Sequence, residues 1–225
     1  MTKHDTHEIT IQQFSMQGLT EDQSIHLSND LRSIFHRAFG KDTWKEERIL
    51  TLFNVWTDIF LGMAGDLPIA YCNVTLENYQ SFGDYLWIES MAIDKIYQNS
   101  GLGYRMLKQA LVTYSAVAWV GARTQNPSFI RLMQKICYPV FPFEDSYQNE
   151  NGQKILNYSR RIIRECEKAN QLGVCKAVYR EGRLGDYPER PDLVEIYKTF
   201  ATLDIDRENG DAVIVIGNKK NNNLI

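Results

Sequence analysis

The sequence predicts a mixed α/β (α+β) fold, in which one sheet is flanked by helices. Short runs of β-branched and aromatic residues alternate with segments whose apolar residues recur every three or four positions. In addition, a glycine-rich turn lies where one such strand leads into a helix. We expect a single domain with a core from about residue 8 to 141. An elaboration over 142–218 and a polar tail over 219–225 would follow.

The first elements are a strand and two helices. Glu8–Ser15 alternates apolar and polar residues, which is typical of a strand. Thr20–Gln23 has the sequence of a capping box, and Gly40 is a plausible stop for the helix that it opens. One face of this helix would carry Leu27, Leu31, Ile34, Phe35 and Ala38. A second helix is predicted over Trp44–Phe53.

Three strands and a helix come next. Ile59–Ala64 and Ile69–Thr75 are strand-like, and the short Gly65–Pro68 connector indicates a hairpin. Tyr85–Ile93 is a further strand, and it leads into the glycine turn. The helix after the turn would place Leu102, Met106, Leu107, Ala110, Leu111 and Tyr114 on one face.

The rest of the core is a strand and a helix. Val117–Val120 is strand-like. Asn126 suits a helix N-cap and Pro127 the first helical position. The apolar residues of this helix are Phe129, Leu132, Met133 and Ile136.

The elaboration is predicted to contain an additional helix and two closing strands. The helix would span Gly152–Gln171, and the strands Val174–Tyr179 and Asp211–Ile216. A long polar excursion, Arg180–Gly210, separates the two strands. The tail, Lys219–Asn223, is expected to be disordered.

Composition narrows the function. A formal net charge of −3 argues against a general nucleic-acid binder. No apolar run reaches membrane-span length, and the first residues lack the apolar core of a signal peptide, so we expect a cytoplasmic protein with no membrane partner. The scattered cysteines and histidines suggest no metal site, and the cysteines are expected to be reduced and mostly buried. These residues are Cys72, Cys137, Cys166, Cys175, His4, His7, His26 and His36.

The glycine turn has the properties of an anion site. Gly101 and Gly103 allow a sharp bend and close approach of the backbone to a ligand. The first N–H groups of the following helix lack intrahelical partners, and the helix dipole adds positive charge there. The sequence contains no Walker loop, and Met106 stands where a dinucleotide fingerprint would need its third glycine.

The turn resembles the acyl-coenzyme A loop of the GNAT N-acetyltransferase superfamily. That loop usually reads Val-x-Pro-x-x-Arg/Gln-x-x-Gly-x-Gly/Ala, and here Ile93, Gln98, Gly101 and Gly103 occupy the matching positions. Lys95 replaces the proline. The order of elements from about residue 8 to 141 also agrees with the GNAT core. The resemblance implies a mostly antiparallel central sheet and acetyl-CoA as cosubstrate.

The resemblance also implies where acetyl-CoA binds. Pantetheine would run along the strand at Met91, Ala92 and Ile93, where a backbone N–H could stabilise the oxyanion. Asn126 could contact pantetheine or serve as a plain helix N-cap. The pyrophosphate would lie on Gln98, Asn99, Ser100, Gly101, Leu102 and Gly103.

Two residues are candidates for proton transfer. Glu89 is the best placed carboxylate to take the proton of the amine, and a solvated or salt-bridged strand residue is the alternative. The family often has a tyrosine where this chain has Met133. Tyr138 could replace it as general acid if the helix end turns its hydroxyl inward, and otherwise it is a packed aromatic. A thiolate with a pKa of about 8.5 could also leave without an acid.

The predicted activity is transfer of acetyl from acetyl-CoA to a primary amine by direct attack. A non-catalytic sensor of CoA thioesters and an enzyme for longer acyl chains are the alternatives. Tyr187 and the acidic run Asp204–Asp211 could recognise a cationic acceptor, which favours a small polar amine. A homodimer is compatible with the sequence.

Overall fold

The computed structural model describes residues 8–40, 45–79, 83–143, 150–162, 169–179, 184–185 and 190–220. The chain forms two compact units, one made of residues 1–76 and 89–113 and the other of residues 77–88 and 114–225. Strands β3 (Leu67–Tyr79) and β4 (Gly83–Ile93) contribute to both units. The expectation of a single domain stays a prediction.

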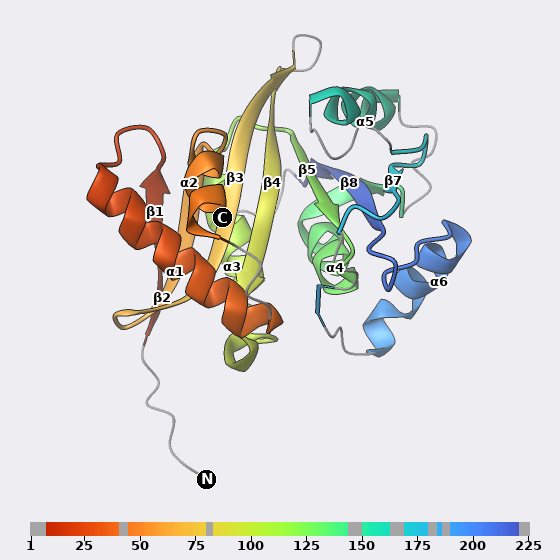
Figure 1. Ribbon diagram of the computed structural model, residues 1–225. Coiled ribbons are helices and arrows are strands. Elements are labelled where there is room, and N and C mark those ends of the chain that lie inside the picture. The colour runs from red at the N-terminus through yellow and green to blue at the C-terminus, as the bar shows by residue number, and fades with distance from the viewer. Residues whose placement is uncertain are drawn as a thin grey trace. The chain divides into compact units, whose positions relative to one another are not determined.

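The first unit is built on strands in the order β1-β2-β3-β4 (Figure 1). β2 pairs antiparallel with both β1 and β3. The further elements of this unit are β1 (Ile9–Ser15), β2 (Asp58–Ala64), α1 (Glu21–Phe39), α2 (Glu46–Phe53), the 3-10 turn η1 (Lys95–Tyr97) and α3 (Leu102–Thr113).

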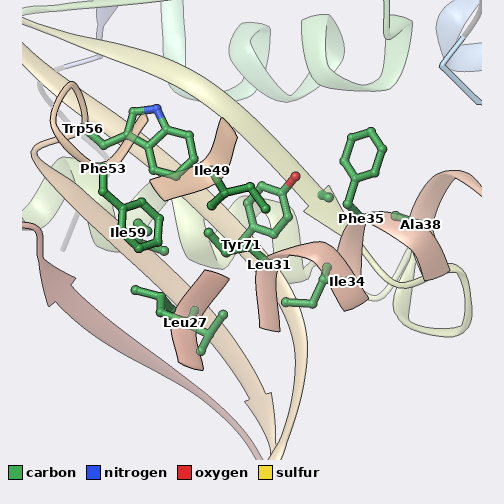
Figure 2. Packing of buried hydrophobic residues seen from close by; sticks show 12 residues of the cluster. Leu27, Leu31, Ile34, Phe35, Ala38, Ile49, Phe53, Trp56, Ile59 and Tyr71 are labelled. Atoms are coloured by element: carbon green, nitrogen blue, oxygen red, sulfur yellow. The ribbon is translucent and has the colours of Figure 1, made fainter. Parts of the chain in front are cut away.

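Helix α1 forms as its sequence predicts. The Thr20 side chain accepts a hydrogen bond from the Gln23 N–H, and the Gln23 side chain accepts one from the Thr20 N–H. Gly40 ends the helix in the left-handed region, at φ 67°. All five residues of the predicted apolar face are buried against α2, β2 and β3. Figure 2 shows Leu31 of α1 near Ile49 of α2 and Tyr71 of β3. Complete burial of a side chain such as Leu31 contributes about 1.5–3 kcal/mol.

Helix α3 packs on the other face of the same strands. Leu61 belongs to the core beneath α1, so the next residue, Gly62, faces the opposite side of β2. A Cβ at Gly62 would lie 3.6 Å from Cδ2 of Leu102, the first residue of α3. In Figure 1, α3 lies behind these strands.

The second unit has the strand order β4-β5-β8-β6, with β7 paired to β8. β4 and β5 are parallel, and β8 is antiparallel to β5, β6 and β7. The predicted fold class is therefore confirmed: the sheet is mixed, mostly antiparallel and accompanied by helices. The elements are β5 (Trp119–Thr124), α4 (Pro127–Ile136), β6 (Cys137–Phe141), α5 (Glu150–Ile162), β7 (Val174–Cys175), η3 (Pro191–Leu193), α6 (Val194–Thr202) and β8 (Ala212–Lys219).

Several predicted boundaries were wrong in this unit. The strand expected at 117–120 lies at Trp119–Thr124. The strand expected at 174–179 ends at Cys175, because Ala177 has a φ of 49° and donates its N–H to the Asp211 carboxylate. The tail does not begin at Lys219, which belongs to β8, is only 8% exposed and donates from Nζ to the Ser115 carbonyl.

Two helix predictions were partly wrong. The additional helix runs from Glu150 to Ile162, and residues 169–171 are not helical. In α4 the buried residues are Pro127, Ile130, Met133 and Ile136, whereas Phe129 and Leu132 are half-buried. Trp44, at the expected start of the second helix, lies outside the described residues.

The cysteines agree with the prediction where the structure describes them. Cys72, Cys137 and Cys175 are buried free thiols, and Cys166 lies outside the described residues. Burial raises the pKa of the Cys72 thiol to about 12, so this thiol is protonated at neutral pH. The described part of the chain contains no group of three or more His, Cys, Asp or Glu residues that could hold a metal ion. None of its helices is long and apolar enough to cross a membrane.

Candidate active site

The candidate site begins where β4 ends. Asp94, the next residue, is buried, with 6% of its surface exposed. Its N–H donates to the Ile69 carbonyl at 2.9 Å, which holds the end of β4 against the start of β3. Its Oδ1 accepts a hydrogen bond from the Ile96 N–H at 3.3 Å and so caps η1. Asp94 therefore fixes the point at which the chain leaves the sheet.

The following turn is closed by its own side chains. The Gln98 side-chain amide donates to the Ile93 carbonyl at 2.9 Å, which joins the two ends of the turn. The Ser100 hydroxyl donates to the Tyr97 carbonyl at 2.6 Å and accepts from the Leu102 N–H at 3.4 Å. Asn99 and Gly101 both have positive φ, 63° and 81°. Gln98, at the family's Arg/Gln position, thus shapes the turn with its side chain.

The turn delivers the chain to the N-terminus of α3. The Gly101 carbonyl accepts from the Arg105 N–H at 3.1 Å, and the N–H groups of the first helical turn precede this bond. A Cβ placed on Gly101 would meet no other heavy atom within 4 Å. Open space at the positive end of a helix dipole, beside the N–H groups of Gly103 and Tyr104, which precede the first intrahelical bond, suits a phosphate group. The residues present therefore fit the pyrophosphate of a CoA ester.

The structure keeps most of the predicted coenzyme residues together. Met91, Ala92 and Ile93 end β4, and residues 98–103 form the turn and the start of α3, all in the first unit. Asn126 belongs to the second unit. Its Oδ1 accepts from the Ser128 N–H at 2.9 Å, so its N-cap role is confirmed, and its contact with pantetheine stays a prediction.

Glu89 is half-buried on β4 and has a hydroxyl neighbour on β3. Oγ1 of Thr75 lies 3.0 Å from Oε1 of Glu89. The adjacent Ser90 hydroxyl accepts from the Asn73 side-chain amide at 3.1 Å. Thr75 and Asn73 share one face of β3, whereas neighbours in a regular strand face opposite ways. We infer that β4 departs from regular alternation at Glu89 and Ser90, and such irregularities redirect side chains near active sites.

Tyr138 lies elsewhere than expected. Helix α4 ends at Ile136, and Tyr138 is part of β6, with 64% of its surface exposed. The packed-aromatic interpretation is therefore wrong, because the buried residues of β6 are Cys137, Val140 and Phe141. Met133 is completely buried and brings no hydroxyl. The general-acid role of Tyr138 stays a prediction.

The excursion before β8 contains packed structure. Leu193, Ile196 and Phe200 of η3 and α6 are buried, and the Phe200 ring centroid lies 5.8 Å from that of Phe143. This part of the excursion therefore belongs to the core of the second unit and is not a solvent-exposed loop. Tyr187 lies outside the described residues.

The acidic run is engaged within the fold. Asp211 accepts hydrogen bonds at 2.9 Å from Lys176 Nζ and from the N–H groups of Ala177 and Asp206. The side chain of Asp206 in turn accepts from the Glu208 N–H at 3.0 Å. Asp211 is therefore not available to a cationic amine, because it is buried and Lys176 supplies its cation. Recognition of a cationic acceptor by the exposed residues of the run, Asp204, Asp206 and Glu208, stays a prediction.

Two polar residues of the candidate site, Thr75 and Asp94, were not predicted from the sequence. Thr75 carries no sequence signal, because its proximity to Glu89 depends on the pairing of β3 with β4. Asp94 could have been found, since an aspartate directly after a strand and before a turn is a common N-cap.

No protein-family model matches the chain, and no curated protein sequence matches it. Solved structures that it resembles include a GNAT-family acetyltransferase from Streptococcus pneumoniae, with 15% identity over 59% of this chain and 87% of that one and a TM-score of 0.43. An aminoglycoside acetyltransferase from an uncultured soil metagenomic sample, solved with sisomicin, has 13% identity, covers 56% of this chain and 84% of its own, and has a TM-score of 0.45. The ribosomal-protein-S18-alanine N-acetyltransferase from Escherichia coli has 16% identity over 96% and 99% of the two chains, with a TM-score of 0.47.

At identities of 13–16% and TM-scores of 0.43–0.47, these three likenesses do not assign a family or a substrate to the chain.

Proposed function

We propose that this protein is an acyl-CoA-dependent N-acyltransferase of the GNAT superfamily that transfers acetyl from acetyl-CoA to a primary amine. The observation that carries the proposal is the junction of β4 with α3. There Gln98 closes the turn onto Ile93, and Gly101 leaves open space beside the first N–H groups of α3. These features suit a ligand with a pyrophosphate group and an extended arm.

In this proposal the backbone of β4 holds the acyl donor. Residues 98–103 bind the pyrophosphate, and the backbone at Met91–Ile93 pairs with the pantetheine arm. One N–H of this strand end stabilises the oxyanion that forms when the amine attacks the thioester carbonyl. A single donor of this kind contributes about 3 kcal/mol.

Glu89 is the proposed general base. The amine must lose a proton before it attacks, since a lysine-like amine has an unperturbed pKa of about 10.4. Glu89 takes this proton, directly or through water, while the thioester C–S bond breaks and the thiolate leaves. A thiolate with a pKa of about 8.5 leaves without protonation.

A second candidate is a CoA-thioester sensor without turnover. The buried Met133 favours it, because a methionine at that position removes the family's usual acid. We propose a small polar amine as the acceptor of the catalytic protein, on the expectation that the exposed Asp204, Asp206 and Glu208 recognise a cation.

Release of free thiol from acetyl-CoA, followed across a panel of polyamines, amino acids, aminoglycosides and peptide N-termini, tests the proposal. Amine-dependent thiol release with a matching acetylated product supports the enzyme. Tight acetyl-CoA binding without release for any amine favours the sensor.

A further inference from the structure

An arginine from α1 contacts the start of the turn that joins β4 to α3, residues 94–101, which we call the coenzyme turn. Arg37 lies in the last turn of α1, and its Nε donates to Oδ2 of Asp94 at 2.6 Å. Its Nη2 donates to the Pro68 carbonyl, and its Nη1 donates to the Ser33 hydroxyl. The Arg37 side chain is 30% exposed and that of Asp94 is 8% exposed. One guanidinium thus joins α1, the beginning of β3 and the residue after β4.

Asp94 uses its remaining hydrogen-bonding groups on the turn itself. Oδ1 caps η1 through the Ile96 N–H, and the main-chain N–H bonds Ile69. One carboxylate oxygen of Asp94 therefore accepts a hydrogen bond from Arg37, and the other accepts one from the main chain of the coenzyme turn. Displacement of Asp94 would move the cap of η1, and η1 leads directly into Gln98.

We propose that Arg37 is a positioning residue for the CoA-binding turn, an inference that rests on the proposed function. Arg37 holds Asp94 in the orientation that caps η1, and the capped turn presents the N–H groups of α3 to the pyrophosphate. Without the guanidinium, a nearly buried carboxylate loses its charged partner, and it regains solvation by swinging the turn outward.

Lysine can replace Arg37 only in part. The three acceptors of Arg37 are a carboxylate, a main-chain carbonyl and a hydroxyl, and they are reached by three different nitrogens of one planar group. An ammonium group is a single point with rotating donors, so it satisfies the carboxylate and leaves at least one other acceptor without its bond.

The direct test is the affinity for CoA, measured by calorimetry, which needs no acceptor. We expect Arg37→Met to weaken CoA binding about tenfold, the effect of losing one charge-assisted hydrogen bond. Arg37→Lys keeps a cation for Asp94 but loses at least one other bond, so its CoA affinity should lie between those of Arg37→Met and wild type. The matched control is Arg32→Met, because Arg32 lies on an exposed part of the same helix, and its CoA affinity should equal that of the wild type.

A second readout separates positioning from general damage. S-acetylpantetheine carries the thioester arm without the pyrophosphate. The kcat/KM for this donor should stay within about threefold of wild type in Arg37→Met, while that for acetyl-CoA falls about tenfold. Equal losses with both donors would show that Arg37 only supports the fold and would overturn the inference.

The remaining outcomes are also decisive. Wild-type CoA affinity in a folded Arg37→Met protein would overturn the role of Arg37 and leave the proposed function intact. A wild-type protein that does not bind CoA would overturn the proposed function and the inference together.

Discussion

The hydroxyl oxygen of Thr75 lies 3.0 Å from a carboxylate oxygen of Glu89 and 3.3 Å from the main-chain carbonyl oxygen of Val55. A threonine hydroxyl has one hydrogen to donate, so an ionised Glu89 and the Val55 carbonyl compete for it. Protonation of Glu89 ends this competition, because the acid donates to Thr75 while Thr75 donates to Val55. The arrangement thus offers Glu89 a hydrogen bond in both protonation states, as a group that gains and releases a proton requires.

Glu89→Gln should lower turnover about 10²–10⁴-fold, the range for loss of a general base. Acetyl-CoA affinity should stay close to wild type, since the base acts on the acceptor. Steady-state kinetics and calorimetry on the same protein check both parts. Turnover within about threefold of wild type across pH would return Glu89 to a structural role.

Thr75→Val should lower kcat about tenfold, because Glu89 loses the neighbour that orients it. Thr75→Ser keeps the hydroxyl and should restore most of the rate. Thr51→Val is the control, since Thr51 is exposed on α2 and its hydroxyl donates to the Glu47 carbonyl of its own helix. If Thr75→Ser were as slow as Thr75→Val, the hydroxyl would not be the group that matters.

Ionised Asp211 is expected to stabilise the fold, and this contribution to the free energy of unfolding should be lost in acid. The pKa of its carboxyl lies below the ordinary value of 3.8: burial alone raises it, and the bonds from Ala177, Lys176 and Asp206 outweigh burial. A group whose pKa is lowered by folding stabilises the native state above its unfolded pKa. This stabilisation is present above pH 3.8 and is lost as the pH falls through the lower, folded pKa.

Asp211→Asn should therefore cost about 1–3 kcal/mol of unfolding free energy at neutral pH, the cost of leaving buried donors unsatisfied. The difference from wild type should shrink as the pH falls below 3.8. Urea unfolding at a series of pH values measures it. A difference independent of pH would show that the charge of Asp211 is not what stabilises the loop.

Elements with local signals could be predicted from the sequence. Helix α1 has a capping box at Thr20, an apolar face and a glycine stop, and all three act within a few residues of each other. Strand β6 has no such signal: it is short, contains Pro139, and forms by pairing with distant β8 at Cys137 and Lys219. Its position depends on register, which the local sequence does not specify.

The candidate site likewise combines residues that a local motif predicts with contacts between residues far apart in the sequence. The turn between β4 and α3 is continuous in sequence, so the motif could place Gln98 and Gly101 between a strand and a helix. The Arg37 and Asp94 pair joins residues separated by 57 positions, and nothing near either residue indicates the other. The contact between Thr75 and Glu89 depends in addition on an irregularity in β4.

The most direct test of the coenzyme site is a calorimetric titration of acetyl-CoA into wild type, Gly101→Val and Gly40→Val. Both glycines have positive φ, 81° and 67°, so the two variants carry similar backbone strain. Apart from its chain neighbours, a Cβ at either glycine meets no atom of the described residues within 4 Å. We predict saturable binding to wild type and to Gly40→Val, with about 2.7 kcal/mol of added stability at 100 times the Kd. Gly101→Val should bind no acetyl-CoA, because its side chain occupies the space of the phosphate. Wild-type affinity in a folded Gly101→Val protein would contradict the assignment of the site.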